Sequence, residues 1–145
     1  MQISSRFAMA VHIFACIDAF PGTRLTSGLL AASIGTNPVI IRRLLKQLKG
    51  AGLLEVARGT GGVTLSRPLS EITFLDIYRA VECSPEEELF RLHERPNPDC
   101  QVGRHIREVL DVRLHQVEAA FERELALIRL ADVTAGVREK IEQEK

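Results

Sequence analysis

The sequence is poor in cysteine, and this limits the kind of small domain that it can encode. Its 145 residues hold three cysteines, Cys16, Cys83 and Cys100, which are widely spaced. A disulfide scaffold has an even set of cysteines and a structural zinc site has closely spaced pairs, so we expect neither. Few and unpaired cysteines are typical of a reducing compartment, and we therefore expect a cytoplasmic protein.

The start of the chain lacks an apolar run long enough to enter a membrane. The uncharged run at residues 7–17 is shorter than the roughly 20 residues that a membrane-spanning helix needs. Only Arg6 precedes this run and Asp18 follows it, which is not the pattern of a secretion signal. We therefore expect an amphipathic first helix and no membrane partner.

A net charge is also missing, but the charges are unevenly distributed. Residues 1–67 have eight Lys or Arg and two Asp or Glu, whereas residues 68–145 have eleven and seventeen. The basic half therefore has a net charge of +6, and such asymmetry favours an anionic partner. A basic surface that is merely solvated is the alternative, and charge alone does not separate the two.

Residue patterns typical of enzymes do not occur. We find no paired carboxylates in a cleft pattern and no Ser/His/Asp spacing, so we expect no enzymatic activity. The glycine-rich stretch at residues 59–62 lacks the Gly-Lys-Ser/Thr ending of a phosphate-binding loop, and a predicted strand follows it.

What the sequence does contain is a series of capped helices and one hairpin. The first three helices are predicted to follow N-caps at Ser4 or Ser5, Thr26 and Asn37, and they span residues 5–19, 27–34 and 38–48. Two strands joined by a glycine-rich tip are predicted at residues 53–57 and 63–66. Further helices are predicted at residues 70–82, with a capping box opened by Ser70, and at residues 102–130.

This order of elements predicts a winged helix. The fold class that we expect is mostly α with a small β-hairpin: a winged helix-turn-helix domain followed by a long helix. Ala31 is small enough for a helix crossing and Gly35 suits the turn between the second and third helices. The predicted parts are the winged domain at residues 1–82, an irregular loop at 83–101, the long helix at 102–130 and a charged, frayed tail at 131–145.

The third predicted helix has one apolar side and one cationic side. The N-terminus of such a helix meets base edges in the major groove, where an arginine can bind guanine or a phosphate. The predicted wing tip adds a cation and backbone donors that can enter the minor groove. The candidate DNA-binding residues are Thr36, Asn37, Pro38, Val39, Arg42, Arg43, Lys46, Arg58, Gly59, Thr60 and Gly61.

Three stretches of the sequence are similar to a known family: MQISSRFAMAVHIF, LAASIGTNPVIIRRLLKQLKGAGLLEVARGTGGVTLSRPLSEITFLDIYRAVE and HERPNPDCQVGRHI. They resemble the Rrf-two family of bacterial winged-helix regulators, the IscR/NsrR/CymR group. The resemblance covers residues 1 to about 130 and is most specific at residues 34–82. It implies a homodimeric, sequence-specific transcriptional regulator, usually a repressor, that binds a pseudo-palindromic site in double-stranded DNA.

The resemblance also implies that the long C-terminal helix forms the dimer interface. An apolar stripe on that helix supports this, because a small domain offers little surface to cover it. Packing within the same chain is the alternative. The candidate interface residues are Ile106, Leu110, Val117, Phe121, Leu125 and Ile128.

Iron–sulfur members of this family have three closely spaced cysteines before the long helix, whereas only Cys100 lies there in this sequence. A cluster held by thiolates needs more of them, so we expect no cofactor and no metal ligands. The sequence instead resembles the cluster-lacking, YwnA-like branch. Cys100 precedes a helix, whose dipole favours a thiolate, and it is the candidate redox or electrophile sensor, with His93 and His105 near it in the sequence.

Three alternatives stay open. Cys100 can pack at the dimer interface without sensing anything. The chain can be a regulator that senses through an iron–sulfur cluster. It can also be a winged-helix module that binds another protein instead of DNA, although such modules tend to lose the cations that Arg42 and Arg43 supply here.

Overall fold

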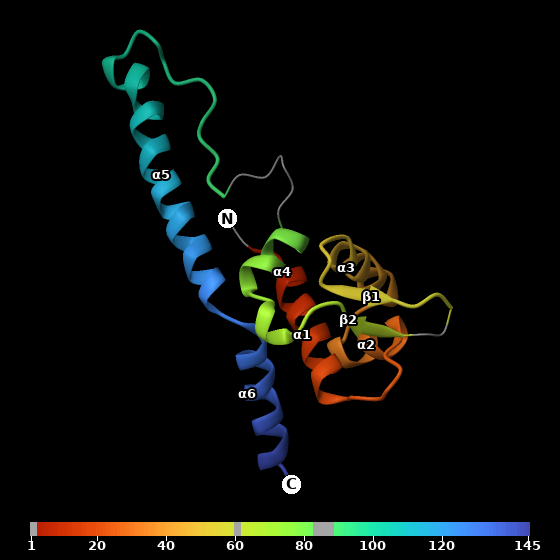
Figure 1. Ribbon diagram of the computed structural model, residues 1–145. Helices are drawn as coiled ribbons and strands as arrows, with labels where there is room; N and C mark the ends of the chain where they lie inside the picture. The colour runs from red at the N-terminus through yellow and green to blue at the C-terminus, as the bar shows by residue number, and fades with distance from the viewer. Residues whose placement is uncertain (1–2, 60–61, 83–88) are drawn as a thin grey trace.

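The computed structural model describes residues 3–59, 62–82 and 89–145, and helices dominate it (Figure 1). The winged domain contains α1 (Ser5–Ala19), α2 (Ser27–Ile34), α3 (Pro38–Gly50), β1 (Leu54–Val56), β2 (Val63–Leu65), the short 3-10 helix η1 (Leu69–Glu71) and α4 (Phe74–Val81). The strands are antiparallel, with Leu54 opposite Leu65 and Val56 opposite Val63. Two further helices, α5 (Gln101–Leu127) and α6 (Leu130–Gln143), follow. The predicted fold class is therefore confirmed.

The first three helices begin at the residues that the sequence predicts. The Ser4 hydroxyl accepts a hydrogen bond from the backbone N–H of Arg6 at 3.2 Å. The Thr26 hydroxyl accepts one from Leu29 at 3.2 Å, and the Asn37 side-chain oxygen accepts one from Val39 at 2.7 Å. Each cap gives a partner to an otherwise unpaired helix donor and stabilises its helix by about 1 kcal/mol.

The core of the winged domain forms around α1, which contacts α2, α3, α4 and α6 (Figure 1). Apolar side chains from every one of these helices and from β1 are withdrawn from solvent, which is the main stabilising contribution to a domain of this size. The largest of the fully buried apolar side chains are Ile13, Phe14, Leu30, Ile41, Leu44, Leu48, Leu53, Leu54, Ile72, Ile77 and Leu130.

The capping box of α4 begins at Thr73, so the prediction that Ser70 opens it is wrong. The Thr73 hydroxyl accepts from the backbone of Asp76 at 3.3 Å, and the Asp76 carboxylate accepts from the backbone of Thr73 at 2.9 Å. Ile72 is fully buried in extended backbone just before this box, which separates η1 from α4. The burial of Ile72 therefore favours Thr73 over Ser70 as the N-cap of α4.

The prediction of one long helix followed by a frayed tail is also wrong. The chain is extended at residues 128–129, where it pairs with the segment before α4. Phe74 donates its backbone N–H to the carbonyl of Ile128 at 2.9 Å, and Leu130 donates to Ile72 at 2.9 Å. α6 then packs against α1 and η1, with Leu130 and Thr134 buried. Residues 130–143 are therefore a helix of the fold.

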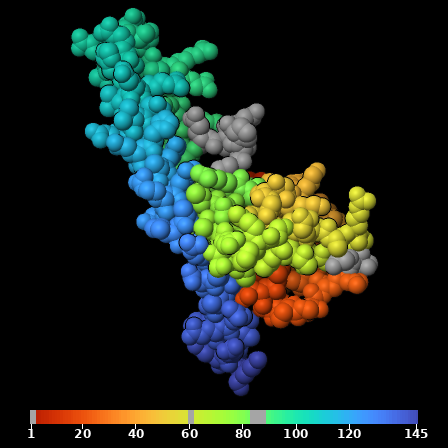
Figure 2. All heavy atoms as spheres, viewed as in Figure 1, coloured from red at the N-terminus to blue at the C-terminus, as the bar shows by residue number. Residues whose placement is uncertain are grey.

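α5 is the longest helix, and it extends away from the winged domain (Figures 1 and 2). Its 27 residues correspond to a length of about 40 Å. None of its residues is buried. Within the described ranges, no helix combines the length and the apolar character that crossing a membrane requires.

Candidate nucleic-acid interface

The turn between α2 and α3 has the geometry of a helix-turn-helix. Gly35 has a φ of +79°, a left-handed conformation that glycine adopts without steric cost. The backbone N–H groups of Gly35 and Thr36 both donate to the carbonyl of Ala31, at 2.9 and 3.0 Å. Ala31 itself is buried, as the crossing of α2 and α3 requires. The roles predicted for Ala31 and Gly35 are therefore confirmed.

α3 holds its apolar side in the core and presents its cationic side to solvent. Its buried residues are Ile41, Leu44, Leu45 and Leu48, and its exposed cations are Arg42, Arg43, Lys46 and Lys49. None of these four cations has an ion-pair partner among the residues that the structure describes. This face therefore carries positive charge that nothing in the described part of the chain neutralises, and such a surface attracts a polyanion.

The first turn of α3 is also open to solvent. Asn37, Pro38 and Val39 are exposed, and Thr36 is half-buried. The cap uses the side-chain oxygen of Asn37, and the side-chain nitrogen makes no hydrogen bond to any residue described in the structure. The end of α3 that would enter a major groove thus has an amide and an apolar side chain available for base edges.

The hairpin forms the predicted wing beside α3, on the side of the domain away from α5 (Figure 1). Arg58 and Gly59 are exposed at its described end, and Gly59 has a φ of +71°. Thr60 and Gly61, which the sequence predicts as DNA contacts, lie outside the described residues.

The base of the wing packs closely against the loop between α1 and α2. A Cβ atom on Gly62 would lie 3.0 Å from Cγ of Arg24 and 3.2 Å from the backbone nitrogen of Leu25. Gly62 also has a φ of +79°, so a larger residue would be both strained and crowded there. The packing brings the exposed residue Arg24 to the wing.

Arg24 is a candidate DNA-binding residue that the sequence reasoning missed. It is the sole Lys or Arg between residues 7 and 41, but its position in the sequence does not show that the chain folds back to the wing. With Arg58 and the four cations of α3, the described surface offers six exposed cations next to the helix-turn-helix and the wing.

The predicted sensor residues are exposed but unconnected. Cys100 is the N-cap residue of α5, and its backbone nitrogen donates to the carbonyl of Asn97 at 3.3 Å. His93 and His105 are exposed, and no hydrogen bond or ion pair joins either of them to Cys100 in the described structure. Cys16 lies elsewhere, buried in the winged domain 3.4 Å from the hydroxyl of Ser33.

The thiols of the described residues do not fit an iron–sulfur cluster. Cys100 is the one described thiol in the loop before α5, Cys16 is in the core, and Cys83 lies outside the described residues. No three His, Cys, Asp or Glu side chains within the described ranges form a group that could hold a metal ion. A cluster needs several thiolates in one place, and the described cysteines do not supply them.

The apolar stripe predicted for dimerisation is divided in the structure. The ring of Phe121 packs edge-on against Tyr78 of the same chain, with centroids 5.3 Å apart. Ile106, Leu110 and Leu125 are half-buried, whereas Val117 and Ile128 are exposed. A second set of apolar side chains on α5 is more exposed, between 59% and 72%: Val102, Val109, Val112 and Leu127.

Comparisons with known proteins agree with this geometry. A sequence model of the Rrf2 (Rrf-two) family, described as "Iron-dependent Transcriptional regulator", matches residues 3–136. The "Putative HTH-type transcriptional regulator YwnA" of Bacillus subtilis (strain 168) is 42% identical over 132 residues, which cover 91% of this chain and 96% of that protein. Both matches run through the helix-turn-helix, the wing and α5.

Solved structures show the same fold. One is described as "Crystal structure of a putative DNA binding protein"; it is 36% identical, has a TM-score of 0.71 and aligns over 89% of this chain and 98% of its own. The structure of CymR, the global cysteine regulator of B. subtilis, has a TM-score of 0.64 at 19% identity and aligns over 93% of this chain and 97% of its own. The second likeness shows the fold alone.

Proposed function

This chain belongs to the Rrf2 family of winged-helix transcriptional regulators, and on that premise we propose that two copies of it bind a pseudo-palindromic DNA site and repress transcription there. α3 enters the major groove, and the wing contacts the adjacent backbone or minor groove. That the chain is a DNA-binding regulator follows from its family. The dimer, the repressor role and the residues that contact DNA are our proposal.

The unpaired cationic face of α3 is the observation that carries this proposal. Arg42, Arg43, Lys46 and Lys49 are exposed without ion-pair partners among the described residues, although the chain as a whole has no net charge. Arg43 and Val39 lie opposite the buried side of the helix, so we assign them to base edges. Arg42 lies to one side of them, and Lys46 and Lys49 lie further from the N-terminus of α3, so we assign these cations to phosphates, with Arg24 and Arg58.

The exposed apolar residues of α5 support the dimer. Val102, Val109, Val112 and Leu127 recur at a helical spacing, and each leaves more than half of its surface in water. Apolar residues that repeat along one side of a helix are typical of an interface, and a two-fold pairing buries the same side of both copies. We therefore move the proposed interface from Phe121, which contacts its own chain, to this more exposed set.

Cys100 is our proposed signal receiver in that dimer. Its thiol is exposed at the start of α5, the helix that we assign to the interface, so oxidation or alkylation there would change a group next to the second copy. Replacing Cys100 with Ser should abolish any effect of diamide on DNA binding while leaving binding by the reduced protein intact. A full diamide effect in Cys100→Ser would remove Cys100 from this role.

Because the proposed DNA site is chromosomal, we propose that the protein acts in the cytoplasm.

The direct test is selection of a DNA site from a random-sequence pool, followed by gel-shift titration of the selected duplex at several salt concentrations. The proposal predicts a saturable shift whose affinity falls steeply with salt, because bound cations release counterions from DNA. Light scattering of the free protein should give twice the chain mass of 16.1 kDa. Absence of any saturable shift would favour a protein-binding module, and a monomer at micromolar concentration would contradict the dimer.

A further inference from the structure

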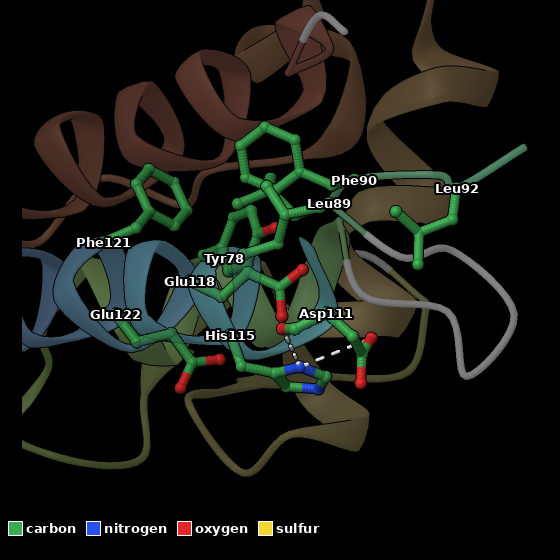
Figure 3. Close-up of a pocket in the computed structure, with 10 residues that line it drawn as sticks. Tyr78, Leu89, Phe90, Leu92, Asp111, His115, Glu118, Phe121 and Glu122 are labelled. Atoms are coloured by element: carbon green, nitrogen blue, oxygen red, sulfur yellow. Dashed lines mark hydrogen bonds and ion pairs between the residues drawn. The ribbon is translucent and has the colours of Figure 1, made fainter. Parts of the chain in front are cut away.

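A pocket lies between α4, α5 and the segment at residues 89–92, apart from the proposed DNA-binding face (Figure 3). Its volume is about 260 Å³. This is somewhat below the roughly 300–1,000 Å³ of sites for drug-sized molecules, so the pocket suits a smaller occupant. Its described lining is Tyr78, Leu89, Phe90, Leu92, Asp111, Leu114, His115, Glu118, Phe121 and Glu122.

One wall of the pocket is aromatic. The rings of Tyr78, Phe90 and Phe121 line it, although the whole chain has only seven aromatic residues, six Phe and one Tyr. Tyr78 and Phe121 meet edge to face at 83°. Aromatic rings that converge on one space attract a cation through the negative charge on their faces.

The other wall carries carboxylates from α5 (Figure 3). Glu122 forms an ion pair with Arg79 at 3.3 Å, and Asp111 lies 3.6 Å from Nδ1 of His115. Glu118 is half-buried, and its carboxylate has no hydrogen bond or ion pair with any residue in the described ranges. Partial burial of an unpaired carboxylate is unfavourable, so a positive group placed beside Glu118 would be stabilised.

We propose that this pocket binds a small organic cation: an ammonium group carried on an apolar body. The rings of Tyr78, Phe90 and Phe121 contact both the apolar body and the cation, and Glu118 supplies the opposite charge. An anion would meet the carboxylate charge of Glu118, which no described residue compensates, and a neutral apolar molecule would leave that charge without a partner among the described residues. The combination of aromatic rings and the Glu118 carboxylate therefore selects for charge as well as shape.

The position of the pocket relates it to the DNA-binding face. α4 forms part of the pocket and packs against α3 on its other side. A molecule in the pocket is thus separated from the recognition helix by one helix. The proposed ligand site does not depend on the proposed function, because binding to it can be measured without DNA.

The chain contains its own probe for this site. Tyr78 is the only tyrosine, and there is no tryptophan, so the intrinsic fluorescence of the protein reports on the pocket. The full chain is titrated with benzyltrimethylammonium, with benzyl alcohol as the neutral compound and phenylacetate as the anion. We expect a saturable change in tyrosine emission with benzyltrimethylammonium and none over the same range with the other two. No saturable change with the cation, or equal saturation with all three compounds, would overturn the proposal.

Two substitutions test the role of the carboxylate. Glu118→Gln keeps the shape of the side chain and removes its charge, and it should weaken benzyltrimethylammonium binding roughly tenfold. Glu108→Gln is the matched control, since Glu108 is exposed on the same helix and does not line the pocket; it should bind like the wild type. Equal affinity in Glu118→Gln and Glu108→Gln would refute the assignment. Neither substitution should alter affinity for the selected duplex when the cation is absent, which keeps this test separate from that of DNA binding.

Discussion

Lys46→Ala gives the sharpest quantitative test of how this protein meets DNA. Lys46 is exposed on α3, has no ion-pair partner among the described residues and lies opposite the buried leucines of that helix. Its removal should therefore leave the fold intact and delete one phosphate interaction from each copy. The matched control is Lys140→Ala, because Lys140 is an exposed lysine on α6, which packs on α1 and η1.

The size of the effect depends on the number of copies bound. Each phosphate that a cation neutralises adds about 0.9 to the slope of log K against log salt. Removing one lysine–phosphate pair in each of two copies lowers the slope by about 1.8, whereas removing it in a single copy lowers the slope by about 0.9. Between roughly 50 and 200 mM salt, the advantage of the wild type over Lys46→Ala should therefore shrink about tenfold for a dimer and about threefold for a monomer.

The assay is a fluorescence-anisotropy titration of a labelled, selected duplex at four or more salt concentrations, with wild type, Lys46→Ala and Lys140→Ala measured in parallel. Lys140→Ala should have the wild-type slope. An unchanged slope in Lys46→Ala would show that Lys46 contacts no phosphate, and the orientation proposed for α3 would be wrong.

Five further substitutions test other parts of the molecule. Arg43→Ala should weaken binding to the selected site by about 1–3 kcal/mol and relax the base preference at one position in each half-site, and an unchanged preference in a repeated selection would remove Arg43 from the bases. Leu130→Ala should lower the free energy of unfolding by about 2–5 kcal/mol in urea titrations, because Leu130 is fully buried. Leu29→Ala, at a half-exposed position, should change this free energy by less than about 1 kcal/mol. Equal effects of the two substitutions would contradict the docking of α6. Gly103→Ala should destabilise the protein, since the added Cβ would lie 2.2 Å from the carbonyl oxygen of Asn97. Gly136→Ala, which has open space around it in α6, should stabilise the protein by about 0.5–1 kcal/mol. Thermal unfolding of both variants shows whether the two changes in stability have these opposite signs.

Local signals in the sequence were sufficient to predict the helices and strands of the winged domain as far as β2. The caps at Ser4, Thr26 and Asn37 and the turn at Gly35 act through atoms a few residues away, so they can be located from the sequence. The sides of α3 could likewise be assigned from periodicity, because its apolar residues recur at helical spacing and its cations lie between them.

Features that depend on distant contacts could not be predicted in this way. Neither proline nor glycine occurs at residues 128–130, and the helix ends there because the backbone pairs with the segment before α4. Periodicity showed that Phe121 lies on an apolar side of α5, but it could not distinguish Tyr78 of the same chain from a second copy. The position of Arg24 beside the wing depends on Gly62, which lies 38 residues away in the sequence.

A hydroxyl-radical footprint on the selected duplex tests the central claim most directly. Two copies that each place α3 in a major groove should protect two backbone tracts related by two-fold symmetry, with centres about 10–10.5 base pairs or a multiple of this apart. A single protected tract, or two tracts that do not follow the helical repeat, would contradict the account.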